Sequence, residues 1–347
     1  MDQNNKFFEE IKDYTVYSIS PFYHLDVEDG VTSRISFIHS QLSEKTNRVI
    51  TIMRGRKNKN SLFDSSTWFY FGSQNKFIHL FDPKILFFMK AEIFKIDKPI
   101  LYVHTIWCFF YAIFFRIFFG IPYVFDNHNV EFDRFYSTRR FLLLPFIFLM
   151  EMLLIYFSKY VIVGSDLDKN RLVKLYGNWA LICVLPMQIE KKQNLDRTEI
   201  LKKYGIPWDK IKLLFFASFS YGPNKEALSY IQDSIIPFLP SNYIFILCWK
   251  DLHVPIIFND RAAYLGYVEN IDDLIYISDC VVAPIFSGGG VKTKILHAMS
   301  YNKNIITTQE GLRGINFENY TNIQIACKDD FLLKILNFSF LFRYESS

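Results

Sequence analysis

The sequence predicts an α/β protein made of two Rossmann-like domains, each a doubly wound parallel sheet covered by helices. Short apolar runs alternate with helical segments along the chain, a pattern typical of parallel sheets built from βαβ units. The chain has 347 residues, enough for two domains of roughly 150 residues each. The polar stretch Pro186–Arg197 interrupts the series of apolar runs, which then starts again. We therefore expect an N-terminal domain over residues 1–185 and a C-terminal domain over residues 186–347.

Each expected strand is a short apolar run. In the first domain the strands are Thr15–Ile19, Arg48–Met53, Thr67–Phe71, Ile100–His104, Tyr123–Asp126, Tyr160–Gly164 and Leu181–Leu185. In the second they are Lys212–Ala217, Tyr243–Cys248, Ala263–Gly266, Cys280–Pro284 and Asn304–Thr307. Sheets of this kind bind ligands at the carboxyl ends of their strands. Two such domains therefore predict a site for two substrates in a cleft between them.

Composition narrows the class of function. The chain has 39 Lys and Arg against 35 Asp and Glu, a balance too even for the basic stripe that nucleic-acid binding requires, so no nucleic-acid partner is expected. The five cysteines are widely spaced in apolar runs, which predicts buried thiols in a reducing compartment; they are Cys108, Cys183, Cys248, Cys280 and Cys327. Because Met1–Asp13 is polar and lacks the apolar core of a secretory signal, we expect a cytoplasmic protein.

Two strongly apolar stretches raise the question of a membrane. They are Trp107–Phe119 and Phe141–Phe157, and the second carries Glu151 near its middle. It allows three interpretations: a membrane span, a helix docked at a membrane surface, or an ordinary buried helix. A span is disfavoured, because strand-like runs precede and follow it and would lie on opposite sides of the bilayer. We expect a membrane surface as a partner, with the protein held peripherally on the cytoplasmic face.

The most informative segment is a glycine-rich turn between two apolar runs, Val281–Thr308. Gly288, Gly289 and Gly290 follow a buried strand and precede an amphipathic helix. Three glycines let the backbone approach a ligand closely, and the amides of a helix N-terminus favour an anion such as a diphosphate. Lys292 and Lys294 add two cations there. The alternative is a flexible strand-to-helix turn with solvated lysines.

This segment resembles glycosyltransferase family 4, also called glycosyl transferases group 1, and in particular its glycine-rich branch. The family run reads roughly P-x-x-x-G-x-G-x-K-x-K-I-L-E-A-M, and Pro284 to Met299 follow it. Further matches occur in order along nearly the whole chain. They are Phe125–Glu131 with H-N-V-E, Val161–Ser165, Val184–Met187, Phe216–Ala227 with its Pro-Asn turn, and Leu265–Val268 with L-G-x-V. The resemblance implies the GT-B fold, in which two Rossmann-like domains face a cleft.

The resemblance implies that the second domain binds a nucleotide-diphosphate sugar. The donor-binding residues it indicates are Ser287, Gly288, Gly289, Gly290, Val291, Lys292, Lys294, His297, Gly266 and Asn224. The sequence departs from the family at two of them. Many relatives have a glutamate at the positions of Gly289 and His297, and a neutral imidazole accepts one hydroxyl hydrogen bond where a carboxylate accepts two. Ala217 also replaces a family glycine.

The resemblance assigns the acceptor to the first domain. His128 matches the histidine near the reacting sugar and is our candidate catalytic residue, and His104 matches a weaker family position. For either histidine, the alternative is a structural hydrogen bond. The other acceptor-binding candidates are Gly30 and Arg34, after the first strand, and Asn129 and Glu131, which are equally well placed to cap a helix.

Together these features predict a retaining glycosyltransferase that moves a hexose to a lipid-linked or glycan acceptor at the cytoplasmic membrane face. The resemblance implies a reaction without a metal or other cofactor, and the D-x-D run at Asp166–Asp168 is explained by helix capping. The leaving phosphate would take the acceptor proton, so no protein nucleophile is required. The alternative is a degenerate, non-catalytic relative that acts as a binding or regulatory subunit, suggested by Gly289, His297 and Ala217.

Overall fold

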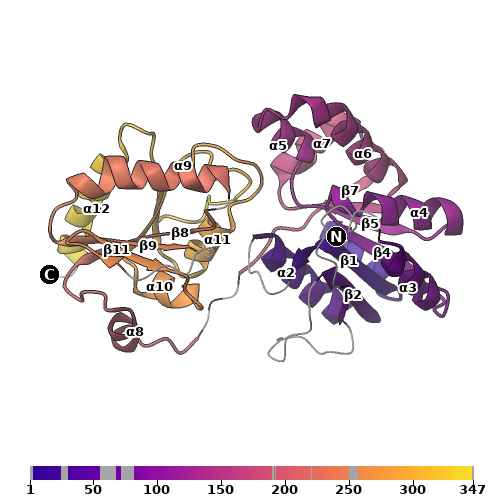
Figure 1. The fold of residues 1–347 in the computed structure, drawn as a ribbon, viewed down its shortest axis with the longest axis horizontal. Helices are drawn as coiled ribbons and strands as arrows, with labels where there is room; N and C mark the ends of the chain where they lie inside the picture. The colour runs from indigo at the N-terminus through magenta and orange to yellow at the C-terminus, as the bar shows by residue number, and fades with distance from the viewer. Residues whose placement is uncertain are drawn as a thin grey trace. The chain divides into compact units, whose positions relative to one another are not determined.

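The computed structural model divides the chain into two compact units, Met1–Met187 and Gln188–Ser347. It describes residues 3–24, 30–54, 68–71, 82–189, 191, 193–219, 221–249 and 257–345. The sequence also contains a basic segment, Arg54–Lys59, which lies, beyond Arg54, outside the described residues. Within these residues, each unit is an α/β fold built on a seven-stranded sheet. Figure 1 shows the helices that pack around the sheet of each unit. The predicted fold class is confirmed.

The first sheet is parallel throughout, in the order β3-β2-β1-β4-β5-β6-β7. Its strands are β1 (Thr15–His24), β2 (Arg48–Arg54), β3 (Trp68–Phe71), β4 (Pro99–His104), β5 (Tyr123–Asn127), β6 (Tyr160–Val163) and β7 (Leu181–Val184). The helices are α1 (Gln3–Ile11), α2 (Gly30–Lys45), α3 (Pro83–Ile93), α4 (Phe109–Phe119), α5 (Glu131–Ser137), α6 (Leu144–Phe157) and α7 (Asp166–Tyr176). The strand order reverses between β1 and β4, the position where such sheets bind ligands.

Alternation along the strands sorts the first unit into two apolar layers. On β4, Leu101 and Val103 pack with α3, α4 and α6, while Ile100 and Tyr102 pack with α1 and α2 on the other face. Strands buried on both faces explain the near-continuous apolar runs in the sequence. The first unit therefore has two cores, one on each side of the sheet.

Local signals in the sequence account for the ends of several helices. The Asp82 carboxylate accepts a hydrogen bond from the Lys84 amide at the start of α3, and Gly120 ends α4 with a φ of 68°. The Ser165 hydroxyl accepts a hydrogen bond from the Asp168 amide and donates one to the Asp168 carboxylate. This confirms helix capping as the explanation of the D-x-D run.

The second sheet has the order β10-β11-β9-β8-β12-β13-β14, with β10 antiparallel to β11 and the other pairs parallel. Its strands are β8 (Ile211–Ala217), β9 (Tyr243–Trp249), β10 (Ile257–Phe258), β11 (Ala262–Gly266), β12 (Cys280–Ala283), β13 (Asn304–Thr307) and β14 (Ile323–Ile325). The edge strands β10 and β14 are short and were not expected from the sequence. The order reverses between β8 and β12.

Helices cover both faces of the second sheet. They are α8 (Arg197–Tyr204), α9 (Gly222–Tyr230), α10 (Ile271–Ile277), α11 (Thr293–Ser300) and α12 (Phe331–Glu345). A π-helical turn, Ile231–Ile235, continues α9 and contacts α12. Figure 1 shows α9 on one face of this sheet and α8 and α10 on the other.

The structure bears on two expectations drawn from the apolar runs: the burial of the cysteines and the nature of the segment Phe141–Phe157. Cys108, Cys183, Cys248 and Cys280 are buried free thiols as expected, whereas Cys327 is exposed because it lies in the turn before α12. The apolar stretch Phe141–Phe157 forms a short 3-10 turn and then α6. Within the described residues, no helix is long and apolar enough to cross a membrane.

Candidate functional site

A cluster of charged and polar side chains lies at the carboxyl edge of the first sheet, next to the point where the strand order reverses. His104 ends β4 and Asp126 lies opposite it on β5, so the pairing of these two strands places them side by side. His128 follows β5 directly. Arg34 reaches the same place from the first turns of α2. The sheet therefore brings three predicted site residues, Arg34, His104 and His128, together around Asp126. Asp126 itself was not predicted.

Asp126 is the centre of this cluster. Its Oδ1 accepts hydrogen bonds from Arg34 Nη2 at 2.7 Å and Nε at 3.1 Å. Its Oδ2 lies 3.0 Å from His104 Nδ1 and 3.0 Å from His128 Nε2. Burial alone would raise the pKa of Asp126, but the Arg34 guanidinium and the two imidazoles hold that pKa well below its usual range. Asp126 is therefore an ionised carboxylate that can only accept hydrogen bonds.

This carboxylate determines which nitrogen of each histidine carries a proton. Burial lowers the pKa of His104 to about 4, although Asp126 opposes the change, so the His104 ring is neutral near pH 7. Its Nδ1–H donates to Asp126, and its Nε2 accepts the Ser18 hydroxyl at 2.9 Å. His128 Nε2–H donates to the same carboxylate, because an ionised carboxylate can only accept hydrogen bonds. In the tautomer of His128 that carries its single proton on Nε2, Nδ1 is an acceptor.

The second nitrogen of His128 is the unusual feature of the cluster. The His128 side chain is only 4% exposed, and its Nδ1 has no hydrogen-bond partner among the described residues. Leaving a buried polar atom unpaired costs roughly 1–3 kcal/mol, so such atoms usually mark a ligand or a bound water. A hydroxyl group that donates a hydrogen bond to Nδ1 would satisfy it.

The cluster also has the composition of a metal site, since one ligand atom each of His104, Asp126 and His128 lies within 4.8 Å of the others. A cation there would have to replace the protons that the two imidazoles share with Asp126. It would also lie close to the Arg34 guanidinium, which is already paired with the same carboxylate. The arrangement is accounted for by hydrogen bonds, and a reaction without a bound metal stays our prediction.

Glu131 and the chain before it are held by a second buried acid, Glu151 of α6. Its two oxygens accept hydrogen bonds from the Asn127 amide group, the backbone N–H groups of Glu131 and Phe132, and the Tyr176 hydroxyl. Burial raises the pKa of Glu151 to about 7. Glu151 therefore caps α5 from another helix, which explains an acidic residue in so apolar a segment.

The remaining acceptor-binding candidates, Glu131, Arg34, Gly30 and Asn129, differ in their burial and in their contacts. The Glu131 carboxylate is buried and pairs with Arg134, as expected for a residue in the first turn of a helix. Arg34 is buried and also donates to the Leu185 carbonyl, so it acts on the site through Asp126. Gly30 is the first residue of α2, and Asn129 is half-buried just before α5. Acceptor contacts by these residues stay predictions.

In the second unit, the glycine-rich turn joins β12 to α11 and packs against the start of α9. Gly288 and Gly290 have φ angles of 114° and 69°, which favour glycine. A Cβ on Gly288 would lie 3.0 Å from the Tyr221 hydroxyl. The Ser287 hydroxyl donates to the Glu226 carboxylate at 2.9 Å. These contacts tie the turn to the start of α9, and the binding of a diphosphate there stays a prediction.

Lys294 and Asn224 meet behind this turn, although they are far apart in the sequence. Lys294 Nζ donates to Asn224 Oδ1 at 2.7 Å and lies 4.7 Å from the centre of the Phe215 ring. The Asn224 amide group donates to the Ser218 carbonyl, which fixes its oxygen toward the lysine. Burial, together with the nearby charge of Lys292, lowers the pKa of Lys294 to about 7. The ammonium is poorly compensated, and an anionic ligand would stabilise it.

Lys292 has a different role from Lys294. It is the N-cap residue of α11, and its Nζ turns back to the Gly290 carbonyl at 2.9 Å and the Glu310 carboxylate at 3.2 Å. In this position Lys292 ties the glycine-rich turn to the segment after β13.

His297 is also bound within the unit. Its Nε2 lies 2.7 Å from Asp272 Oδ1, which accepts a further hydrogen bond from the Tyr301 hydroxyl. An ionised carboxylate cannot donate, so Nε2 carries the proton of this hydrogen bond. The imidazole packs against Phe216 at the end of β8.

The last two donor-binding candidates are Gly266, the last residue of β11, and Val291, in the glycine-rich turn before α11. Gly266 ends β11 with a φ of 62°, where the pairing with β9 shifts register. Val291 packs partly against the core of the unit.

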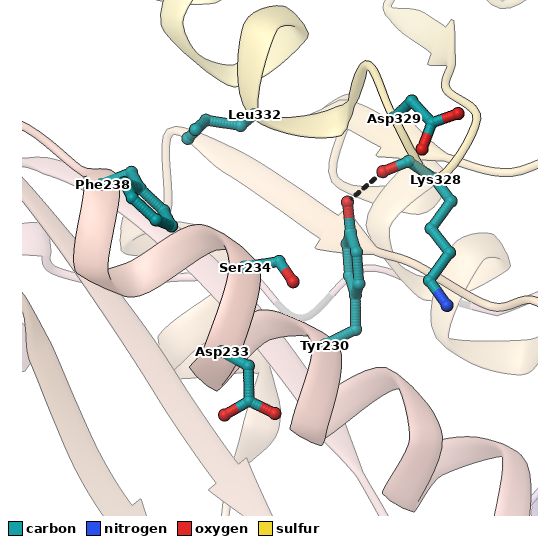
Figure 2. A pocket seen from close by; sticks show the side chains of 7 residues that line it. All are labelled: Tyr230, Asp233, Ser234, Phe238, Lys328, Asp329 and Leu332. Carbon is teal, nitrogen blue, oxygen red and sulfur yellow. Dashed lines mark hydrogen bonds between the residues drawn. The ribbon is translucent and has the colours of Figure 1, made fainter.

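A separate hollow of about 420 Å³ lies between the end of α9, the π-helical turn and the start of α12, as Figure 2 shows. It is lined by Tyr230, Asp233, Ser234, Phe238, Lys328, Asp329 and Leu332, none of which was predicted as a site residue. Tyr230 donates to the Lys328 carbonyl and packs on Phe286, which precedes the glycine-rich turn. The hollow is therefore adjacent to the back of that turn.

Comparison with known proteins adds a family and a fold. Residues 212–337 match the family model described as glycosyl transferases group 1. Among curated proteins, no sequence matches the chain. Solved structures do match over most of their length and establish the two-domain GT-B fold.

Three of these structures are representative. HepE of Anabaena in complex with UDP-glucose has a TM-score of 0.70 at 13% identity, over 93% of this chain and 88% of that one. Sucrose-phosphate synthase of Thermosynechococcus elongatus has a TM-score of 0.69 at 12% identity, over 93% and 89%. WaaG, a glycosyltransferase involved in lipopolysaccharide biosynthesis, has a TM-score of 0.65 at 12% identity, over 93% and 90%.

Proposed function

We propose, from the membership of residues 212–337 in the glycosyl transferases group 1 family, that this chain transfers a hexose from a nucleotide-diphosphate sugar to a lipid-linked or polysaccharide acceptor. The observation that carries the proposal is the half-buried Lys294, held by Asn224 at the glycine-rich turn and lacking a carboxylate partner among the described residues. A diphosphate supplies the negative charge that this ammonium lacks. UDP is the first nucleotide to test, because HepE has been solved with UDP and with UDP-glucose.

The donor site would stabilise the leaving diphosphate. Backbone amides of Gly288 to Gly290 and the start of α11 present partial positive charge, and Lys294 adds a full charge nearby. Such fixed dipoles and charges stabilise a leaving group without reorganising during the reaction. We assign charge neutralisation to these groups and propose a reaction that does not depend on a metal ion.

The sugar-binding side of the reaction would use His128. Its Nδ1 is an acceptor aimed at no group of the described chain, and a sugar hydroxyl fits it. We propose that the configuration at the anomeric carbon is retained: the acceptor hydroxyl attacks from the face that the diphosphate leaves, and the departing phosphate oxygen takes its proton. His128 then orients the reacting sugar, and no protein nucleophile is formed.

The direct test is release of a nucleoside diphosphate by the purified chain. We expect UDP to raise the midpoint of thermal unfolding by binding the folded state. We also expect UDP-sugars to release UDP when a membrane extract supplies the acceptor. The absence of both a thermal shift and nucleotide release across the common sugar nucleotides would rule out the proposal.

One observation favours the second candidate, a binding subunit without catalysis. His297 stands where many relatives have a glutamate, and Asp272 already holds its Nε2. A His297→Glu variant would place two carboxylates together, and their repulsion would raise the pKa of one of them. We expect the double variant His297→Glu/Asp272→Asn to bind UDP more tightly than the parent, and His297→Glu alone to gain less.

Titration calorimetry distinguishes the outcomes, with Asp272→Asn alone as the matched control. A weakened enzyme gains affinity in the double variant. UDP binding in none of the four proteins would favour the binding subunit.

A further inference from the structure

One helical layer of the first unit carries many large apolar side chains that face outward. In α3 and α4, and at their ends, Phe87, Phe94, Ile117 and Phe118 are all more than half exposed. In the turn before α6 and along that helix, Phe141, Leu142, Leu143, Phe146, Leu149 and Tyr156 are exposed as well. The helices adjoin one another, since α4 packs on α6 and the Phe94 ring meets Phe119. We call this surface the α3–α4–α6 face.

The other face of the same sheet is built differently. Among the described side chains of α1 and α2, no large hydrophobic residue is exposed. The two layers cover the same strands, so the overall apolar composition of the chain does not explain the difference. Large exposed apolar patches of this kind mark a surface that another molecule covers.

The most exposed part of this face is the tip of a helical hairpin. Helices α5 and α6 run antiparallel, because Phe132 packs on Phe148 and Tyr136 packs on Phe141. The two helices contact each other, and Figure 1 shows them in one group with α7. Between them, Leu142 is 98% exposed, and Arg139 and Arg140 precede the apolar turn. We call residues 139–146 the α5–α6 tip.

Charge distinguishes the α4 and α6 part of this face from a protein-binding patch of mixed sign. Between residues 105 and 159, each acidic side chain is engaged inside the unit: Asp126 by Arg34, Glu131 by Arg134, Asp133 by Arg171, and Glu151 by Tyr176 and backbone amides. Arg116, Arg139 and Arg140 in the same span have no carboxylate partner among the described residues. Apolar side chains edged by uncompensated cations complement the surface of an anionic bilayer.

We propose that the α3–α4–α6 face, led by the α5–α6 tip, docks on an anionic lipid bilayer. The 14 residues of α6 span about 21 Å, less than the roughly 30 Å of a bilayer core, and Glu151 is tied to α5 and α7. The helix therefore lies in the interface. This deepens the proposed function, because a lipid-linked acceptor would be presented there.

Vesicle sedimentation without nucleotide tests docking independently of turnover. We expect the full chain to bind vesicles of phosphatidylcholine and phosphatidylglycerol mixed at about 7:3, and to bind pure phosphatidylcholine more weakly because the electrostatic contribution is missing. The Phe141→Ser/Leu142→Ser variant should bind the anionic vesicles about tenfold more weakly. The matched control is Leu333→Ser, an exposed leucine of α12, which should bind like the parent.

The arginines are tested separately. Arg139 has a positive φ of 57°, so Arg139→Asn preserves the backbone, and it is combined with Arg140→Gln. We expect this variant to lose the salt dependence of vesicle binding.

Two results would overturn docking on lipid: anionic vesicles that fail to bind the parent, or tip variants that bind them as well as the parent does. A parent dimer that Phe141→Ser/Leu142→Ser converts to monomer, with no vesicle binding, would assign the face to a second copy of the chain. Nucleotide release with a detergent-dispersed acceptor tests the proposed function without a bilayer. Membrane docking and sugar transfer can therefore each fail without ruling out the other.

Discussion

Replacing Asp126 by asparagine is expected to lower turnover by about 100-fold while changing the KM for the donor little, because a misoriented hydrogen bond at the reacting sugar acts on the transition state. Asparagine has one acceptor and one donor where the carboxylate has only acceptors. Arg34 would retain the oxygen, since it can only donate. The amide N–H₂ would then face the histidines, and His128 Nε2 would become an acceptor. Its Nδ1 would carry the proton and repel the hydroxyl donor that it is proposed to bind.

The same substitution leaves Arg34 buried with a neutral partner. Breaking a buried ion pair on one side costs about 3 kcal/mol or more of the free energy of unfolding. A loss of activity caused by unfolding must therefore be separated from one caused by a change in the His128 tautomer. Denaturant unfolding measures the change in the free energy of unfolding. The ¹⁵N chemical shifts of the imidazoles identify the tautomer, because they distinguish a protonated Nε2 from a protonated Nδ1.

Asp126 is proposed as a positioning residue that acts through His128, and this sets the control. His128→Ala should lower turnover in the background of Asp126→Asn much less than it does in the parent, because the two act as a unit. If the folded Asp126→Asn protein keeps the parent's tautomer and turnover, the role assigned to Asp126 is wrong. If turnover falls with an unchanged tautomer, Asp126 acts through packing alone.

Replacing Lys294 by alanine is expected to weaken donor binding at least tenfold, since a cation next to a diphosphate is typically worth 1.5–3 kcal/mol as a charged hydrogen bond, about 10- to 100-fold in affinity. Lys292→Ala should lose less, because Lys292 already binds the Gly290 carbonyl and Glu310. Calorimetry with UDP measures both. Parent-like affinity in Lys294→Ala would remove this residue from the diphosphate site.

The lysine also predicts a pH dependence whose sign follows from its lowered pKa. Below pH 7 the ammonium is already charged, whereas above about 7 the unliganded protein must take up a proton to bind the anion. Affinity should therefore fall as the pH rises above 7, by up to about tenfold per pH unit. Lys294→Arg stays charged throughout this range and should bind UDP with a flatter pH profile. Proton uptake follows from calorimetry in buffers of different ionisation enthalpy.

The sequence was sufficient to predict the two parallel sheets, because strands buried on both faces form continuous apolar runs that pattern alone detects. It was sufficient for the glycine-rich turn as well, since positive φ angles at Gly288 and Gly290 require that residue type. The short edge strands β10 and β14 were missed, because two or three residues carry too little pattern. The domain roles and the donor and acceptor contacts stay predictions.

The residues that organise the first site could not be identified from the sequence in the same way. Asp126 stands within the segment that resembles the family, but its role depends on lying opposite His104, and that requires the order of β4 and β5. Glu151 is an isolated acid in an apolar helix. Its partners come from α5 and from Tyr176, 25 residues later, so only the fold shows that it is satisfied. Single motifs indicate candidate groups, whereas the sheet order determines which groups meet.

The position of the α5–α6 tip has a consequence for how the reaction should be measured. Helix α5 begins three residues after His128, so the apolar turn at Leu142 and this histidine, which we propose binds the sugar, belong to one continuous segment that starts at the carboxyl edge of the sheet. A chain held to a bilayer by this tip searches for a lipid-linked acceptor by lateral diffusion in two dimensions. Its apparent KM for that acceptor should then follow the mole fraction of acceptor in the membrane, and diluting the acceptor with inert lipid should slow the reaction at constant bulk concentration.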